Sequence, residues 1–398
     1  MSEEMNLARS SSCTVILPCT GSYEATAVTL QSILSQEVEE AEVIVSCNGM
    51  GRKEYKDLKR HLRRRIKSDI AQAQSEINAQ RAMNGQMPIR FVYSHKAGKA
   101  HALNIAIRYA SYDIICIVDA DCRFKGLDAL TRLLYNMTGD VIAAGGRIVV
   151  DRSAGGDISA GNRTIVHHHI TMLQKIQQVE YNRTFMLLRP ALSYIRAVNL
   201  VSGAFGAFTK AVVTACGGYD ETFVGEDMEL TLRMQRYCRA KHIPYSVIYD
   251  PRAVIYTSVP TSVHRLFRQR DRWQRGLVGS YLKNISLKRD MAPAMRYIVM
   301  NYMLIFGIGT PYFAVAGLLR QWQFEHILLI IALWLAAENV FNIIAELRRR
   351  HLDGSLKDGM SIFEILLLTP VSMLAELLLL IPARLYGNIT YAWRKDVW

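Results

Sequence analysis

The pattern of hydrophobic and polar residues along this chain changes near residue 296. Before that point, short apolar runs alternate with polar, helix-like segments, and the strand-like runs are residues 14–18, 42–46, 89–93, 114–118 and 141–150. Strand, short turn and helix in alternation are typical of an open α/β sheet. The unbroken, largely β-branched run 114–118 predicts a strand buried on both faces of a mainly parallel sheet.

Long apolar runs follow residue 296 and predict membrane helices. Residues 297–319 and 327–345 are each long enough to cross most of a hydrocarbon core of about 30 Å. A third run, 362–381, is interrupted by Glu364, Pro370 and Glu376, which leaves a crossing or an interfacial segment open. The basic residues at 348–350 favour a cytoplasmic position for the loop after the second run.

These patterns predict how the chain is divided. We expect a cytoplasmic α/β domain at 1–280, a basic interfacial linker at 281–296, and a membrane region at 297–398 with two or three apolar helices. Within the first domain, the charged stretch 52–84 predicts a helical insertion, and 164–198 predicts amphipathic helices. The expected location is the cell membrane, multi-pass, with the catalytic domain in the cytoplasm.

Net charge and cysteine content limit the kinds of binding partner that we expect. The net charge of +13 suits an anionic partner, but no basic-aromatic recognition motif accompanies it, so we expect membrane lipids and no nucleic acid. The seven cysteines form no CxxC pair, which argues against a zinc site or a disulfide framework. The first residues lack the features of a signal peptide, in agreement with a cytoplasmic start.

Two carboxylates, Asp119 and Asp121, directly follow the most apolar strand. The carboxyl ends of strands are where open α/β sheets bind ligands. Carboxylates spaced i, i+2 can act together on a divalent cation and on the anion that it carries. A plain turn is the alternative interpretation, because Asp also favours strand ends.

Three further motifs carry candidate chemistry. Gly98-Lys99 precedes a helix, where backbone N–H groups and the helix dipole favour an anion. Glu226 and Asp227 open another helix, where capping is the alternative role. Gln269-Arg-Asp-Arg272-Trp273 lies in an arginine-rich segment suited to phosphate oxygens, and its tryptophan offers a flat face to a sugar or a base. The alternative is that this basic segment contacts lipid headgroups.

In this order the four motifs resemble the inverting family-2 glycosyltransferases, and among them the membrane-embedded synthases of cellulose, hyaluronan, chitin and poly-N-acetylglucosamine. The resemblance covers about residues 13–280 and the apolar segments after them. It implies a GT-A fold, a Rossmann-like mixed α/β sheet that binds nucleotide sugars, commonly UDP-linked, with Mg²⁺ or Mn²⁺. The implied partners are a nucleotide-sugar donor, a glycan or lipid-linked acceptor, and an accessory export protein or an oligomer.

The resemblance also implies residue roles. Asp119 would contact the nucleotide, Asp121 would ligate the metal, Asp227 would be the general base, and Lys99 would lie near the nucleotide. The motif residues that would hold the pyrophosphate and the acceptor end are Gln269, Arg272 and Trp273, with Glu226 beside them. One departure is Asn48, an amide where the family usually has an aspartate that recognises the base, so the base preference stays open.

The sequence leaves three other functions open. The first is a single-transfer enzyme on a lipid acceptor, similar to ceramide glucosyltransferase. The second is a phosphoryl-transfer enzyme with Asp119 as nucleophile, disfavoured because that motif wants Thr or Val where Arg123 stands. The third is a catalytically silent nucleotide-sugar receptor, against which the intact Asp227 and the arginine-tryptophan motif argue.

Overall fold

The computed structural model describes residues 12–19, 23–72, 87–151, 170–284, 324–354, 359–391 and 393. It divides into two compact units, which are described separately. The first holds the segments up to Val166 and Val198–Ser258; the second holds His167–Ala197 and Val259–Lys395. The expected apolar run 297–319, and the parts of the expected insertion, amphipathic segment and linker at 73–84, 164–169 and 285–296, lie outside the described residues.

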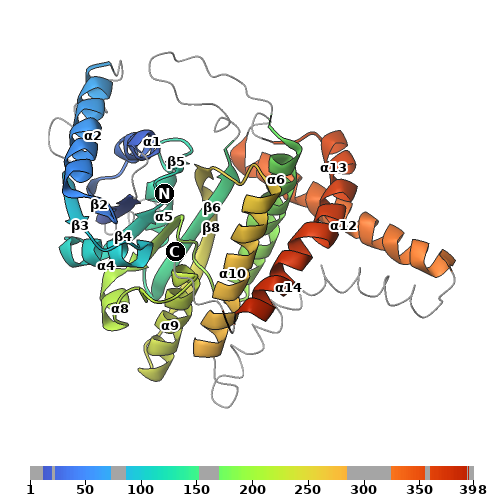
Figure 1. Cartoon of the computed structure of the whole chain (residues 1–398). Coiled ribbons are helices and arrows are strands. Elements are labelled where there is room, and N and C mark those ends of the chain that lie inside the picture. Colours follow the sequence, from blue (N-terminus) through green and yellow to red (C-terminus); the bar gives the residue numbers. More distant parts are fainter. Residues whose placement is uncertain are drawn as a thin grey trace, which may run out of the picture. The chain divides into compact units, whose positions relative to one another are not determined.

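The first unit is an α/β structure (Figure 1). Its strands are β1 (Ser12–Cys19), β2 (Glu40–Asn48), β3 (Ile89–Ser94), β4 (Ile114–Val118), β5 (Cys122–Phe124), β6 (Val141–Val150), β7 (Phe205–Thr209) and β8 (Ser246–Thr257). Its helices are α1 (Tyr23–Leu34), α2 (Arg52–Gln72), α4 (Lys99–Tyr109), α5 (Ala129–Tyr135), α8 (Lys210–Ala215) and α9 (Glu226–Ala240).

The eight strands form one mixed sheet in the order β3-β2-β1-β4-β7-β6-β8-β5. The four strands at the β3 end run parallel, and β7 pairs antiparallel with both β4 and β6. The predicted buried strand is confirmed, because Ile115 to Val118 in β4 are fully buried. Parallel β1, β2 and β4 bring their carboxyl ends to one edge of the sheet, where the motif residues Asn48 and Asp119 follow.

Two local features of the sheet depend on pairing between strands. The apolar stretches on either side of Pro251 form the single strand β8, whose register against β6 shifts between Gly146 and Arg147. The second half of the glycine-rich stretch after Val201 is strand β7. Gly206 allows this close packing, since a Cβ there would lie 2.3 Å from Cγ1 of Val201.

The second unit is helical. Its elements are α6 (Met172–Arg183), the π-helical turn η2 (Thr184–Leu188), α7 (Arg189–Tyr194), α10 (Val263–Asn284), α12 (Phe324–Asp353), α13 (Ile362–Ala375), the π-helical turn η3 (Glu376–Leu380) and α14 (Ile381–Thr390). Helix α13 begins with a capping box between Ser361 and Glu364 and continues through Pro370. The helix therefore runs on through the polar positions that interrupt the third apolar run.

Two stretches are long and apolar enough to cross a membrane, Leu328–Asp353 and Ile362–Thr390. Only 11% of the most apolar window of the first stretch is buried, and 33% of that of the second. A core helix of a soluble protein would be mostly buried, so these faces are the ones expected to meet lipid. Arginines in the last turns of the first stretch are ion-paired: Arg349 pairs with Glu346 at 2.7 Å and with Asp353 at 3.2 Å, and Arg350 pairs with Glu346 at 2.9 Å.

Candidate active site

The turn after β4 is fixed by its backbone. The N–H of Asp119 donates to the carbonyl of Ala204 at 3.1 Å, and the N–H of Cys122 donates back to the carbonyl of Asp119. From α1, the Thr29 hydroxyl donates to the carbonyl of Ala120 at 2.8 Å. The two carboxylates of this turn are therefore presented from a rigid backbone, as a binding site for an ordered ligand requires.

Lys99 is the centre of an acidic cluster. It is the first residue of α4, and its Nζ lies 2.5 Å from Oδ1 of Asp119 and 3.9 Å from Oε1 of Glu226. It also donates to the carbonyl of Gly203 at 3.1 Å. The structure thus brings Glu226 together with Lys99 and Asp119, two predicted site residues that lie more than a hundred positions earlier in the sequence.

Asp227 lies beside this cluster at the start of α9. Its Oδ2 accepts from the N–H of Gly203 at 2.8 Å, and its Oδ1 accepts from the N–H of Met228 at 2.8 Å. The second bond is the helix-start role that the sequence left as an alternative. The bond from the Gly203 N–H does not belong to that helix-start role, because it ties the Asp227 carboxylate to the loop before β7. A Cβ on Gly203 would lie 3.1 Å from Nζ of Lys99 and 3.3 Å from Cβ of Asp227, so this loop packs tightly into the cluster.

The electrostatics follow from one ammonium facing three carboxylates. Burial disfavours the charged form of Lys99, but Asp119 and Glu226 outweigh it and raise its pKa. Burial raises the pKa of Glu226 to about 7, with Lys99 opposing and Asp227 adding to the shift. Burial also raises the pKa of Asp119, which Lys99 only partly offsets. The cluster keeps an excess of negative charge that a further cation would relieve.

Asp121 is the carboxylate of the turn that faces outward. Its Oδ2 accepts from the hydroxyl of Ser258 at 3.1 Å, and no lysine or arginine of the described residues is ion-paired with it. Among the described residues no group of three or more His, Cys, Asp or Glu could hold a metal alone. One unpaired carboxylate fits the way Mg²⁺ is held by one or two carboxylates and completed by substrate phosphates and water.

Asn48 ends β2 and is almost fully buried. Its Nδ2 donates to the carbonyl of Gly98 at 2.6 Å, so the amide fastens the turn that leads to Lys99. Its Oδ1 is buried and has no hydrogen-bond partner among the described residues. The structure gives a reason for an amide here, since a carboxylate would set an oxygen against the Gly98 carbonyl.

The arginine-tryptophan motif lies on α10, in the second unit. The ring of Trp273 is 43% exposed and is covered on one face by Arg270, whose Cζ lies 4.4 Å from the ring centroid. Arg270 is buried and donates to Glu180 at 2.6 Å. Oε1 of Gln269 is buried without a partner among the described residues. Because this motif and the acidic cluster belong to different units, their joint action stays a prediction.

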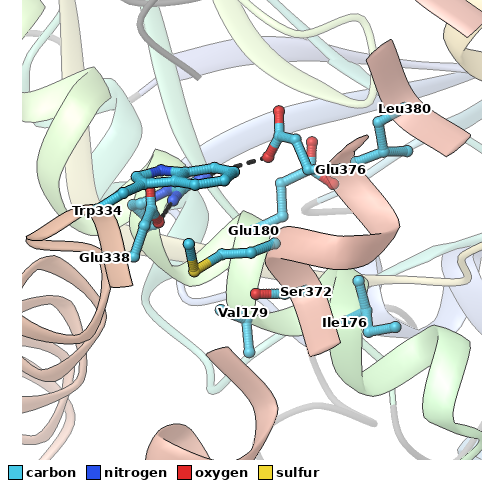
Figure 2. Close-up of a pocket in the computed structure, with 10 residues that line it drawn as sticks. Ile176, Val179, Glu180, Trp334, Glu338, Ser372, Glu376 and Leu380 are labelled. Carbon is cyan, nitrogen blue, oxygen red and sulfur yellow. Dashed lines mark hydrogen bonds and ion pairs between the residues drawn. The ribbon is translucent and has the colours of Figure 1, made fainter. Parts of the chain in front are cut away.

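Figure 2 shows a pocket within the second unit, lined by residues that include Trp334, Glu338 and Glu376. Arg183 of α6 pairs with Glu338 of α12 and lies 3.7 Å from Glu376 of η3. Arg384 pairs with Glu376 at 2.9 Å. Glu338 therefore faces protein, because its charge is matched within the helical unit and need not meet lipid.

Several residues of the site were not recognised in the sequence. Gly203, Ser258 and Tyr219 contribute a backbone donor, a hydroxyl near the metal candidate and a buried hydroxyl near the acids. A glycine and two common hydroxyl residues carry no spacing signal of their own. Only the position of Gly203, in a small-residue stretch between two acidic motifs, could have suggested it.

A mixed sheet with a paired-aspartate turn after its fourth strand and an acid pair opening a later helix places the first unit among the α/β proteins, with the candidate site at the exit of β4. A family model described as "Glycosyltransferase like family 2" matches residues 11–276, and the chain belongs to this family. The predicted family, GT-A fold and enzyme class are thereby confirmed.

Curated proteins with similar sequences are named as polysaccharide synthases. The poly-beta-1,6-N-acetyl-D-glucosamine synthase of Staphylococcus epidermidis is 25% identical over 296 residues, covering 73% of this chain. The synthase of the same name from Staphylococcus aureus is 25% identical over 290 residues, 72% of this chain. The match spans only 59% and 60% of these two relatives.

A solved structure, the mannosyltransferase PcManGT from Pyrobaculum calidifontis in complex with GDP-Man and Mn²⁺, has a TM-score of 0.55. It is 18% identical, and the match covers 98% of this chain and 89% of that one. At this identity the likeness concerns the fold.

Proposed function

We propose that this protein is an inverting glycosyltransferase that transfers a sugar from a nucleotide sugar, UDP-linked, to a growing polysaccharide at the cytoplasmic face of the membrane. The names of the two staphylococcal relatives make N-acetylglucosamine the first sugar to test. The mannosyltransferase with GDP-Man and Mn²⁺ supports a nucleotide-sugar donor and a divalent cation on the same fold.

The observation that carries the proposal is the cluster of Lys99, Asp119, Glu226 and Asp227 at the exit of β4. This cluster is acidic, whereas a nucleotide diphosphate is an anion, so the two repel each other unless a divalent cation joins them. Asp121 is the carboxylate that would hold that cation, because it is exposed and none of the described lysines or arginines is ion-paired with it. When bound there, the metal would neutralise the leaving diphosphate.

In this proposal Lys99 and Asp227 have different roles in the transfer. Lys99, which sits between the acids in the free protein, can turn its ammonium toward the donor phosphates. Asp227 would accept the proton of the acceptor hydroxyl as that oxygen attacks the anomeric carbon. Its Oδ2 is held by the Gly203 N–H, which aims the carboxylate before any substrate is present. One displacement inverts the anomeric carbon, and no enzyme nucleophile takes part.

The buried amide of Asn48 supports recognition of a base. Its Oδ1 is an acceptor without a protein partner in the described part of the chain, held in place because the Nδ2 of the same amide is bound to Gly98. Uracil offers a ring N–H that such an acceptor can take. An amide oxygen carries less charge than a carboxylate, so we expect weaker discrimination between bases than an aspartate would give.

The test uses the full chain purified in detergent with a panel of nucleotide sugars and Mn²⁺, measured as release of nucleoside diphosphate. We expect one donor to be turned over and Asp227→Asn to lose at least about a hundredfold in rate. Asp128→Asn, at the exposed start of α5, is the matched control and should keep full activity. A folded Asp227→Asn protein with normal turnover would contradict the assignment of Asp227 as the base, and a folded unmodified protein that binds a donor without turning it over would favour the receptor.

Product size separates a polymerase from an enzyme that makes one transfer to a lipid. A ladder of products from labelled donor supports polysaccharide synthesis. A single glycolipid would exclude it while leaving the glycosyltransferase assignment intact.

A further inference from the structure

The partly exposed tryptophan of α10, Trp273, lies against a buried arginine of the same helix. Cζ of Arg270 lies 4.4 Å from the ring centroid, and Arg270 is only 4% exposed whereas Trp273 is 43% exposed. The two residues are three positions apart, so they are neighbours on one side of the helix. The guanidinium therefore supports the indole from the protein side, while a large part of the ring stays open to a ligand.

Arg270 is held in turn from a second helix. Its Nη2 donates to Oε2 of Glu180 in α6 at 2.6 Å. Its Nε is buried without a partner among the described residues, so Glu180 is the group that orients the guanidinium. A charge-assisted hydrogen bond of this kind is strong and directional, because the donors of a guanidinium lie in a rigid plane.

Glu180 also faces a third helix. Its Oε1 lies 3.9 Å from Nη2 of Arg384 in α14, and Nη1 of Arg384 donates to Oε1 of Glu376 at 2.9 Å. Glu180 and Glu376 both line the pocket of Figure 2. The carboxylate of Glu180 therefore lies between two arginines, one from α10 and one from α14, and its position is set from both sides.

Stability alone does not account for this arrangement. Replacing a buried ion pair by apolar side chains of similar volume is often neutral or stabilising, because both charges have lost their hydration. An apolar side chain could not, however, offer the indole a flat cationic support whose plane is fixed by a hydrogen bond. An aromatic ring that is held in one orientation before a ligand arrives loses less entropy on binding it.

We propose that Glu180 and Arg270 are positioning residues that hold the ring of Trp273 in the orientation that stacks on the terminal sugar of the acceptor glycan. The proposal rests on the proposed function, which makes the acceptor a glycan. Arg270 acts through the ring, and Glu180 acts through Arg270. Acceptor affinity should therefore depend on both residues, whereas donor affinity and the chemical step should not.

The test compares the unmodified full-length protein in detergent with Glu180→Gln and with Arg270→Lys. Glutamine keeps an oxygen for Arg270 but removes the charge, and lysine keeps a cation for Glu180 but removes the planar group under the ring. The acceptor is a β-1,6-linked N-acetylglucosamine trimer, and the donor is UDP-N-acetylglucosamine with Mn²⁺. In each variant we expect the KM for the trimer to rise about tenfold, with kcat and the donor KM within about twofold of the unmodified protein.

A double variant shows whether the effect passes through the tryptophan. In a Trp273→Ala protein, adding Glu180→Gln should leave kcat/KM for the trimer unchanged, because there is no ring left to position. A further drop of about tenfold would show that Glu180 acts elsewhere and would overturn the proposal. Glu364→Gln is the matched control, since Glu364 also pairs with a cation of α6, Lys175, at 3.4 Å in the same unit. Its trimer KM should equal that of the unmodified protein.

An unchanged trimer KM in Arg270→Lys, or a fall in kcat at constant KM, would overturn the proposal even if Glu180→Gln does not fold. A protein that turns over no nucleotide sugar would instead overturn the proposed function. Calorimetric titration of the trimer without donor then decides the role of Glu180 and Arg270. Tighter binding by the unmodified protein than by Arg270→Lys supports it, and equal or absent binding overturns it.

Discussion

Replacing Lys99 by methionine tests whether the ammonium is what allows the acids at the exit of β4 to be ionised together. Methionine keeps most of the length of the side chain and removes its charge. Lys99 lies 2.5 Å from Asp119 and 3.9 Å from Glu226, and all three side chains are largely buried. Removing one partner of a buried ion pair destabilises a protein by about 3–5 kcal/mol, because the other charge is left uncompensated.

The loss should depend on pH. The pKa of Glu226 is already about 7 in the folded protein, above its value in the unfolded chain, so the folded state binds more protons and stability falls as pH rises between those two values. In Lys99→Met the pKa of Glu226 rises further. In Lys99→Met the stability of the folded protein should therefore decrease more as pH rises, and the decrease should continue above neutral pH. Near pH 5 Glu226 is protonated and loses little, so the destabilisation there should be smaller than near pH 8.

Thermal unfolding in detergent, recorded from about pH 5 to about pH 8, measures this effect. At the alkaline end we expect a loss of about 3 kcal/mol, which for a unit of this size is a lowering of the midpoint by roughly 6–12 °C. Lys96→Met is the matched control from the same turn, since Lys96 is exposed and its pair with Glu221 should contribute less than about 1 kcal/mol. An equal loss at both ends of the pH range would refute the reasoning.

Three further changes test other parts of the site. Asp121→Ala should abolish the Mn²⁺-dependent part of donor binding in titration calorimetry; equal affinity with and without Mn²⁺ in both proteins would remove the metal assignment. Asn48→Asp should lower the thermal midpoint and weaken donor binding, by about 1–3 kcal/mol, because its carboxylate opposes the Gly98 carbonyl; tighter binding would show that the amide is not needed there. Gly218→Ala should destabilise by about 1–3 kcal/mol through the clash with Asn104, and more than Gly217→Ala, which also has a positive φ but no neighbour within 4 Å; equal midpoints would contradict this.

Much of the sheet could be predicted because its strands are continuous apolar runs. The residues of β4 and the start of α4 at Lys99 agree closely with the pattern. Strand β7 could not be predicted, since its glycine and alanine residues read as a flexible segment, and only its antiparallel neighbours β4 and β6 make it a strand. Short β5 depends in the same way on pairing with β8.

The candidate site shows the same division between local signal and tertiary context. Asp119, Lys99 and Asp227 occur in motifs, so the sequence pointed to them, and the fold brings them together. The sequence alone gave no reason for an amide at Asn48. The reason is a hydrogen bond to the carbonyl of Gly98, fifty residues away, which exists only in the folded chain. The role of Gly203 is likewise a backbone role, which no side-chain pattern can reveal.

The charges of the cluster explain why an enzyme for an anionic donor would have an acidic site. If the cluster were neutral or basic without ligand, it would bind diphosphate without metal and release the product slowly. With Lys99 shared among Asp119, Glu226 and Asp227, we expect the free site to repel a bare diphosphate and to accept one that arrives with a divalent cation. Under the proposed function, Lys99 would exchange these acids for the donor phosphates when the donor binds, so the same ammonium would serve both states of the site.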